Sequence, residues 1–123
     1  LKQLDLYDNN LRKIPESLGS LKSLERLNLR NNQLHSLPSS LSNLKSLKIL
    51  NLSWNNFKLL PEWIGSLSSL EELNLWGNLL ETIPESLASL SLLKILDLNF
   101  NNIEEIPPFL KELEQERGLI IKI

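Results

Sequence analysis

The sequence predicts an α/β solenoid in which a parallel β-sheet lines the concave face and short helical turns cover the convex face. First, leucines recur every 23 residues, without insertion, along most of the chain. Second, each repeat contains a Leu-x-Leu element, which has the two-residue period of a β-strand. Third, each repeat ends on apolar residues at helical-turn spacing after a proline. Because one such unit cannot bury its apolar side alone, the repeats must stack around a shared core.

Five copies of the unit occupy residues 1–115, and the chain is expected to form a single domain. The unit is written L-x-x-L-x-L-x-x-N-x-L-x-x-(I/L)-P-x-x-L-x-x-L-x-x, and its first leucine is called repeat position 1. In the strand, the leucines at positions 4 and 6 point into the core and position 5 points outward. The leading leucines are Leu1, Leu24, Leu47, Leu70 and Leu93.

An asparagine follows the expected strand at position 9 of every repeat. Its side-chain amide both donates and accepts, so it can pair with backbone groups that a sharp turn leaves unpaired inside the stack. A structural role is therefore expected for Asn9, Asn32, Asn55, Asn78 and Asn101.

A proline at position 15 marks the start of the convex segment. Proline fixes the backbone φ angle and suits the first turn of a helix. The apolar residues at positions 18 and 21 follow at helical-turn spacing, which predicts a short helical segment of either α or 3₁₀ type. These prolines are Pro15, Pro38, Pro61, Pro84 and Pro107.

The C-terminal end departs from the repeat, and residues 108–123 are expected to form a capping helix and a closing sixth strand. The stretch 108–117 is more charged and is predicted to be an amphipathic helix that stops at Gly118. Leu119 and Ile121 keep the 23-residue step, so they are expected to continue the two leucine rows.

The N-terminal end has no comparable cap. The chain starts at Leu1, inside a repeat and without an initiator methionine, which favours a segment of a longer protein. The first strand is expected to present an unpaired edge beside an open leucine core. That edge is covered by an upstream segment, or it promotes self-association of the chain.

The repeat resembles the leucine-rich-repeat family over essentially the whole chain. It is most similar to the 23-residue subclass with Leu-Pro or Ile-Pro in the connecting turn, which occurs in bacterial, archaeal and plant intracellular proteins and in scaffolds that bind Ras-like GTPases. The resemblance implies a curved solenoid whose variable strand positions, 3, 5, 7 and 8, face the concave side. It is specific for the fold and carries little information about the ligand.

Position 5 forms a polar row along the middle of the expected concave face. One interpretation is a solvated strip whose side chains hydrogen-bond one another across strands. The alternative is a set of acceptors for a protein partner, which makes Asn51, Asn74 and Asp97 candidate binding residues. The row is Asp5, Asn28, Asn51, Asn74, Asp97 and Ile120.

Positions 7 and 8 bring three aromatic side chains onto the same face. Trp54 and Trp76 come from adjacent repeats, and Phe100 lies two strands from Trp54, roughly 10 Å by strand spacing. Gly77 between them is expected to leave a shallow apolar gap with Trp76 as its wall. The alternative is that these rings fold back and only cover backbone at the rim.

Four further residues complete the candidate binding set. Arg30 shares position 7 with Trp76, while Ile49 and Ile95 at position 3 flank Glu72 on the neighbouring strand. Exposed aromatic and aliphatic groups on an otherwise polar face are suitable anchors for a protein partner.

Position 2 alternates in charge sign along the repeats. On parallel strands this pattern is expected to form a cross-strand charge ladder that supports register and solubility. The ladder residues are Lys2, Glu25, Lys48, Glu71 and Lys94.

Two aromatic residues at convex position 17, Trp63 and Phe109, are expected to pack locally or to form a second contact patch.

Catalysis finds little support in this sequence. His35 is the only histidine, cysteine is absent, and no phosphate loop or nucleophile elbow exists among four glycines. No metal site and no cofactor are therefore expected, and the chain is not expected to be an enzyme. The absence of cysteine suits a reducing compartment, which favours a cytoplasmic location.

The function predicted is recognition of a protein partner on the concave face. The formal net charge of −2 gives no reason to expect nucleic acid, and no apolar stretch is long enough to span a membrane. The first alternative is a structural or regulatory repeat segment of a larger protein, linked to a GTPase, kinase or ligase domain. A weaker alternative is a glycan or lipid binder, in which Asn74 and Asn99 would assist the aromatic rings.

Overall fold

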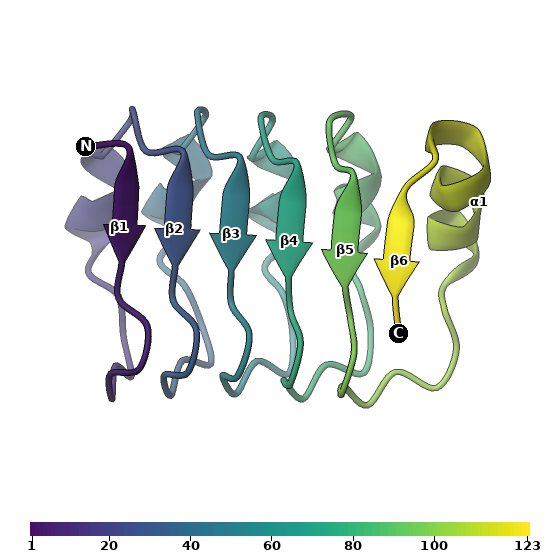
Figure 1. Ribbon diagram of the computed structural model, residues 1–123, viewed down its shortest axis with the longest axis horizontal. Coiled ribbons are helices and arrows are strands. Elements are labelled where there is room, and N and C mark those ends of the chain that lie inside the picture. The colour runs from purple at the N-terminus through teal and green to yellow at the C-terminus, as the bar shows by residue number, and fades with distance from the viewer.

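The computed structural model describes residues 1–123 as a coil of stacked repeats with one parallel, six-stranded sheet in the order β1 to β6 (Figure 1). Each strand is short because the chain turns away from the sheet soon after every Leu-x-Leu element. The predicted solenoid is confirmed. The strands are β1 (Gln3–Asp5), β2 (Arg26–Asn28), β3 (Ile49–Asn51), β4 (Glu72–Asn74), β5 (Ile95–Asp97) and β6 (Ile120–Lys122).

Neighbouring strands from β1 to β5 pair residues of the same repeat position. Leu4 lies beside Leu27, Leu27 beside Leu50, and the same step continues to Leu96. Side chains at one repeat position therefore form a row across the sheet, with the leucines of position 4 inside and positions 3 and 5 outside.

The convex side is formed by four 3₁₀ helices and one α-helix. The tighter 3₁₀ turn fits because each segment has only five residues before the chain returns to the sheet. The sequence suggested that the prolines of position 15 belong to the first turn of these helices, and this was wrong. Pro15, Pro38, Pro61 and Pro84 are extended residues that directly precede the helix. The 3₁₀ helices are η1 (Glu16–Ser20), η2 (Ser39–Asn43), η3 (Glu62–Ser66) and η4 (Glu85–Ser89).

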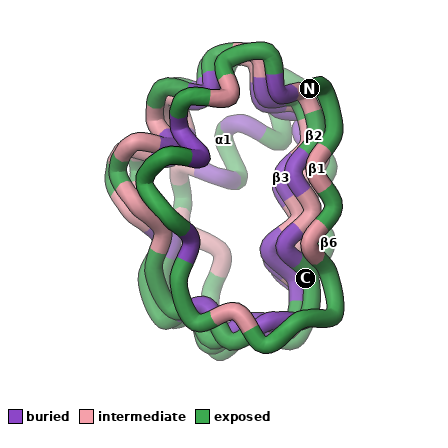
Figure 2. The backbone as a smooth tube through the Cα atoms, turned by 90° about the vertical axis from the view of Figure 1, so that its left-hand side faces the viewer, coloured by how far each residue is buried: buried purple, intermediate pink, exposed green.

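The core is a continuous column of leucine and isoleucine inside the coil. Viewed along the solenoid axis, the buried residues line the inside of the tube and the exposed residues its outside (Figure 2). The largest fully buried side chain is that of Phe57, which stands where three other repeats have leucine. Each repeat thus buries its apolar side only against its neighbours.

Four of the five asparagines of position 9, all except Asn9, bind the backbone of two consecutive repeats. The Asn55 Nδ2 donates to the carbonyls of Leu29, Leu52 and Ser53, and its Oδ1 accepts from the Leu34 amide at 3.0 Å. Asn32, Asn78 and Asn101 make the equivalent bonds in their repeats. Backbone groups that would be unpaired inside the turn are satisfied in this way.

The C-terminal end closes with helix α1 (Pro108–Arg117), which lies across the far opening of the coil (Figure 2). Leu110 and Leu113 of α1 are buried in the core. Gly118 ends the helix in the left-handed conformation at φ 69°. Arg117 donates to the Ala88 carbonyl, which holds the helix against η4.

The register expected for the last strand was wrong by two residues. Ile121, rather than Leu119, pairs with Leu96, and Lys122 lies beside Asp97. Ile120 therefore extends the row of position 3, not that of position 5. Helix α1 is longer than the 3₁₀ helices, so the last strand begins two residues later than the 23-residue period predicts. Because the strand register is shifted by an even number of residues, the same side chains still face the core.

At the N-terminal end, the core leucines of the first repeat are partly exposed. Leu4 and Leu6 are only half-buried, whereas their counterparts Leu27 and Leu29 are buried.

None of the helices has the length and apolarity that a membrane crossing requires.

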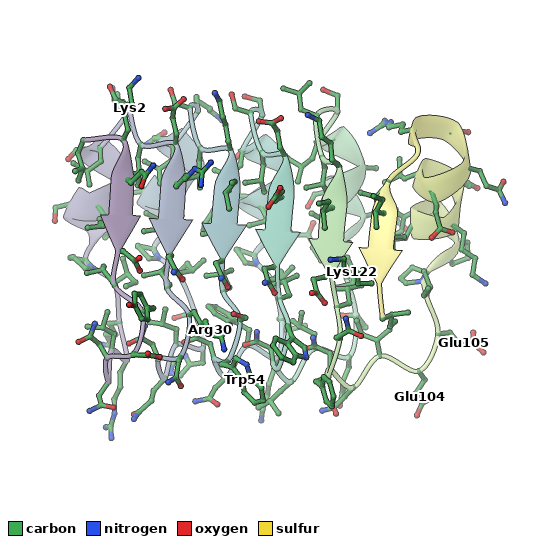
Figure 3. All side chains as sticks on the ribbon, viewed as in Figure 1. Lys2, Arg30, Trp54, Glu104, Glu105 and Lys122 are labelled. Atoms are coloured by element: carbon green, nitrogen blue, oxygen red, sulfur yellow. The ribbon has the colours of Figure 1, made fainter.

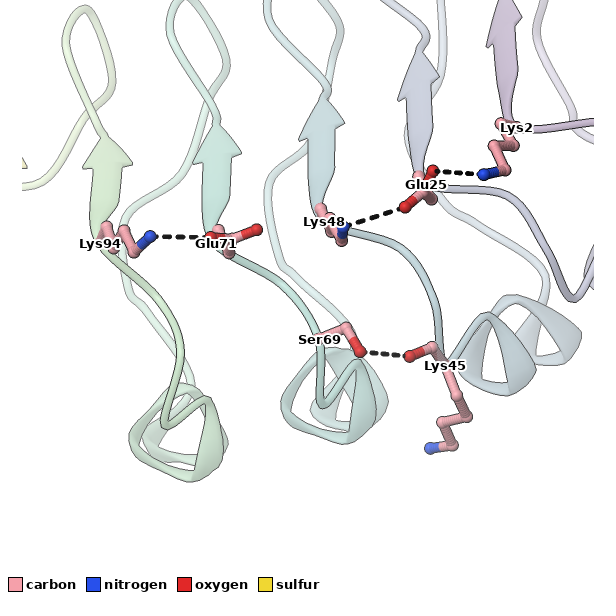
Figure 4. Close-up of polar contacts among 7 residues, drawn as sticks. All are labelled: Lys2, Glu25, Lys45, Lys48, Ser69, Glu71 and Lys94. Atoms are coloured by element: carbon pink, nitrogen blue, oxygen red, sulfur yellow. Dashed lines mark hydrogen bonds and ion pairs between the residues drawn. The ribbon is translucent and has the colours of Figure 1, made fainter.

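The charges of position 2 form ion pairs between strands (Figure 4). Glu25 lies 2.9 Å from Lys48 and 3.9 Å from Lys2, and Glu71 lies 2.8 Å from Lys94. Lys48 and Glu71 do not pair, so the ladder is interrupted at its centre. The hydrogen bond and the positive charge of Lys48 lower the pKa of Glu25, and the same contact raises the pKa of Lys48.

Candidate functional site

The outward strand positions and the residues directly after the strands form the concave face (Figure 3). Two parts of this face stand out. The aromatic row consists of Trp54, Trp76 and Phe100 and follows strands β3 to β5. The polar hollow lies beside it and follows β1 to β3. It is lined by Tyr7, Asp8, Asn28, Arg30, Asn31, Asn51 and Trp54.

The side chains of position 5 bond their own repeat rather than their neighbours. In each of the five repeats the side-chain oxygen accepts from the backbone amide two residues later, for example Asn51 from Ser53 and Asn74 from Trp76, both at 3.0 Å. This is the turn that asparagine and aspartate favour, and it ends each strand. The expectation that these side chains hydrogen-bond one another across strands was therefore wrong.

The turn leaves one side of each asparagine amide free. In Asn28, Asn51 and Asn74 the oxygen is engaged with the backbone, and the Nδ2 group has no partner within the chain. These half-buried side chains present a row of donors to the concave face. Asp97 differs, because its Oδ1 also accepts from the Asn99 side chain at 2.9 Å.

Position 8 requires a left-handed backbone in every repeat. Asp8, Asn31 and Gly77 suit this conformation, but Trp54 and Phe100 also adopt it, both at φ 55°. A bulky side chain in this region costs roughly 1–2 kcal/mol. The two aromatic residues occupy positions for which the backbone favours Asn, Asp or Gly, so scaffold stability does not explain them.

The three aromatic rings contact one another in sequence. The ring centroids of Trp54 and Trp76 lie 5.4 Å apart at an interplanar angle of 62°, and those of Trp76 and Phe100 lie 5.8 Å apart. The open gap expected at Gly77 is absent, because the Trp54 indole lies directly on that glycine, about 3.0 Å from where a Cβ would be. The aromatic row is a continuous ridge rather than a pocket.

The rings differ in exposure. Phe100 is 74% exposed and Trp54 is 43% exposed, whereas Trp76 is half-buried between them. The Nε1 group of Trp76 is buried without a hydrogen-bond partner. Ser53, at the same repeat position as Trp76 and Arg30, is fully buried, so position 7 faces outward only in some repeats.

The polar hollow has a volume of about 550 Å³. Arg30 and Trp54, which lie on the same side of the sheet (Figure 3), line it together. The Arg30 guanidinium carbon lies 6.0 Å from the ring centroid of Trp76, so this residue joins the hollow to the aromatic row. The lining residues are Tyr7, Asp8, Asn28, Arg30, Asn31, Asn51 and Trp54.

The sequence predicts only part of this lining. Tyr7, Asp8, Asn28 and Asn31 are not among the predicted binding residues, although they occupy outward repeat positions. Their register is the signal that could have identified them. They belong to the same position rows as the predicted residues, one or two strands toward the N-terminus.

The remaining candidates lie on the same face but apart from the aromatic row. Ile49 lines a second, smaller hollow of about 210 Å³ nearer the start of the strands, together with Asn51. Glu72 and Ile95 continue the row of Ile49 on β4 and β5 and are half-buried. Asn74 and Asp97 likewise lie in the row beside Asn51.

The other residues singled out by the sequence lie outside the concave face and do not form a candidate binding site. Trp63 and Phe109 are half-buried against the core. His35 lines a hollow with Leu59 and Leu79. No group of three or more His, Cys, Asp or Glu side chains is arranged to hold a metal ion.

Comparison with known proteins identifies the repeat. A family model described as "Leucine-rich repeat region" matches residues 1–79, and a second, described as "Leucine rich repeat", matches residues 58–103. Comparison with curated proteins finds no match.

Among solved structures, 264 chains match, so the fold is a common one. One of them is a leucine-rich-repeat protein of Leptospira interrogans, which is 39% identical at a TM-score of 0.90. The match covers 98% of this chain and 30% of that chain, so this chain spans only part of the relative's length. The repeats, the parallel sheet and these matches together show that the chain belongs to the leucine-rich-repeat family.

Proposed function

We propose that this chain is a recognition module that binds a protein partner on its concave face through the aromatic row. Leucine-rich-repeat domains are in general protein-interaction modules, which supports the class of function. No nucleic acid, cofactor or catalytic role is part of the proposal.

The observation that carries the proposal is the aromatic row itself. Trp54 and Phe100 are exposed, and both are held in a backbone conformation that opposes bulky side chains. Contiguous exposed aromatic groups on a rigid sheet are the usual anchors of protein interfaces. The rings lose little side-chain entropy on binding because they already contact one another.

A second function is also supported by one observation. The matched relative is much longer than this chain. The match covers 98% of this chain but only 30% of the relative. A structural role within a longer array of repeats is therefore proposed beside partner binding, and the two roles are compatible.

The proposal is tested by selection of random peptides displayed on phage against the folded chain. We expect enriched peptides that bind the wild type and fail to bind the double variant Trp54→Ala, Phe100→Ala. Both side chains are exposed, so circular dichroism should show the variant still folded.

The matched control is Leu59→Ala, because Leu59 is 69% exposed and lines a different hollow. Peptides that bind the double variant as well as the wild type, or lose binding on Leu59→Ala instead, contradict the proposal.

A further inference from the structure

The polar hollow contains an arginine with no anionic partner. Arg30 forms none of the three ion pairs of the chain, and its guanidinium lies over the Trp76 ring instead. Asp8 lines the same hollow, but its Oδ1 accepts from the Asn31 side chain at 2.8 Å. The ring attracts the guanidinium electrostatically at this distance, and the guanidinium N–H donors have no acceptor within the chain.

Two neighbours of Arg30, Asn28 and Asn51, add hydrogen-bond donors. The oxygens of Asn28 and Asn51 are engaged by backbone amides, at 3.1 and 3.0 Å, which turns their Nδ2 groups outward as unpaired donors. Tyr7 lines the same hollow. The hollow therefore combines an unpaired cation with two free amide donors, an arrangement complementary to a carboxylate.

Resting on the function proposed above, we propose that this hollow binds the carboxylate of an Asp or Glu side chain of the protein partner. Arg30 provides the main charge-assisted hydrogen bonds, and Asn28 and Asn51 donate to the same group. A polyanion such as nucleic acid fits poorly, because it would bring many negative charges to a face that also carries Asp5 and Asp8, whereas a side-chain carboxylate brings a single charge to Arg30.

The distance between hollow and aromatic row also defines the spacing in the partner. Arg30 follows β2, and Phe100, the most exposed ring of the aromatic row, follows β5, three strands away, which corresponds to roughly 14 Å. An extended chain covers that distance in about four residues. The partner segment recognised is therefore an acidic residue about four positions from an aromatic or large aliphatic residue.

The test uses synthetic peptides selected on the wild-type chain. We expect the selected peptides to share this spacing, and replacement of their Asp or Glu by Asn or Gln to weaken binding about tenfold or more. On Arg30→Gln the same replacement should have no further effect, because the partner of the carboxylate is already absent. Raising the salt concentration should weaken binding to the wild type more than binding to Arg30→Gln.

The matched control is Arg26→Gln, since Arg26 also faces the concave side without an ion pair but lines the second hollow. Equal effects of both variants, or selected peptides without an acidic residue, overturn the carboxylate inference alone. A complete absence of selected peptides contradicts the proposed function and, with it, the inference. Binding of a single-stranded oligonucleotide through Arg30 in place of peptides also overturns it.

Discussion

At the scale of single residues, the asparagines of position 9 and the aromatic residues of position 8 perform opposite tasks. Asn55 satisfies buried backbone groups of two repeats and is itself 5% exposed. Phe100 is 74% exposed and occupies a left-handed backbone position. The first residue type serves the scaffold, and the second adds surface chemistry at the expense of local strain.

Replacement of Asn55 by alanine should destabilise the fold by about 2–4 kcal/mol. The Leu34 amide is buried and would lose its acceptor, and three carbonyls would each lose one of their donors. The measurement is urea-induced unfolding followed by circular dichroism. The control is Asn9→Ala, since Asn9 is exposed and accepts no bond from a preceding repeat; equal losses in both variants would contradict the structural role.

Replacement of Phe100 by asparagine should change the unfolding free energy by less than about 1 kcal/mol. Relief of the left-handed strain, roughly 1–2 kcal/mol, offsets the lost contact with Trp76, about 0.5–1.5 kcal/mol. By contrast, Phe57→Ala should cost about 3–5 kcal/mol, because Phe57 is fully buried. If Phe100→Asn lost as much as Phe57→Ala, the aromatic row would be part of the scaffold rather than of a binding surface.

At the scale of elements, the spacing between repeats is set by close contacts on the convex side. Any side chain at Gly19 or Gly65 would collide with the backbone of Ser40 or Ser86 in the next 3₁₀ helix. On the sheet side, the ion pairs of position 2 join β1 to β2, β2 to β3, and β4 to β5. Both the close backbone contacts and the ion pairs join neighbouring repeats, as expected of a solenoid.

The ion pair of Glu25 and Lys48 should make a small, salt-sensitive contribution to stability that depends on pH at both extremes. The lowered pKa of Glu25 means that its contribution is present above the unfolded value of about 4.3 and is lost as the pH falls through the folded value. The raised pKa of Lys48 means that its contribution is present below about 10.4 and is lost as the pH rises through the folded value.

The measurement is the difference in unfolding free energy between the wild type and Lys48→Gln across pH. It should be constant between those limits and shrink in acid and in high salt. Lys58→Gln serves as the control, because Lys58 forms no ion pair. A difference that persists in acid would show that Lys48 acts through packing instead.

At the scale of the whole molecule, the two ends of the stack differ. Helix α1 covers the last repeat, whereas the core leucines of the first repeat are half-exposed. The 123-residue chain is therefore expected to associate through β1 at high concentration. Light scattering with size-exclusion chromatography should show a dimer that dissociates on dilution and is absent in Leu4→Lys. The control is the exposed Leu92→Lys, and a wild type that stays monomeric at all concentrations would contradict the expectation.

The fold class and the residues that form each row across the sheet follow from the amino-acid sequence alone. A period of 23 residues without insertion allows only one stacking register for the repeats, and the Leu-x-Leu element decides which side chains point inward. The aromatic, polar and charged rows follow from that register. The period does not settle which way every position faces: Ser53 shares position 7 with Trp76 and Arg30 but is fully buried. That positions 7 and 8 face the concave side was predicted from the family resemblance.

The contacts and hydrogen bonds that the side chains of those rows make became known only from the folded structure. It showed that Asn51 accepts from the backbone amide of its own repeat, that Trp54 covers Gly77, and that the Arg30 guanidinium lies over the Trp76 ring. It also showed that α1 shifts the last strand by two residues. Periodicity specifies the direction of a Cα–Cβ bond, whereas rotamers, turn hydrogen bonds and ring contacts depend on neighbours that only the folded stack brings together.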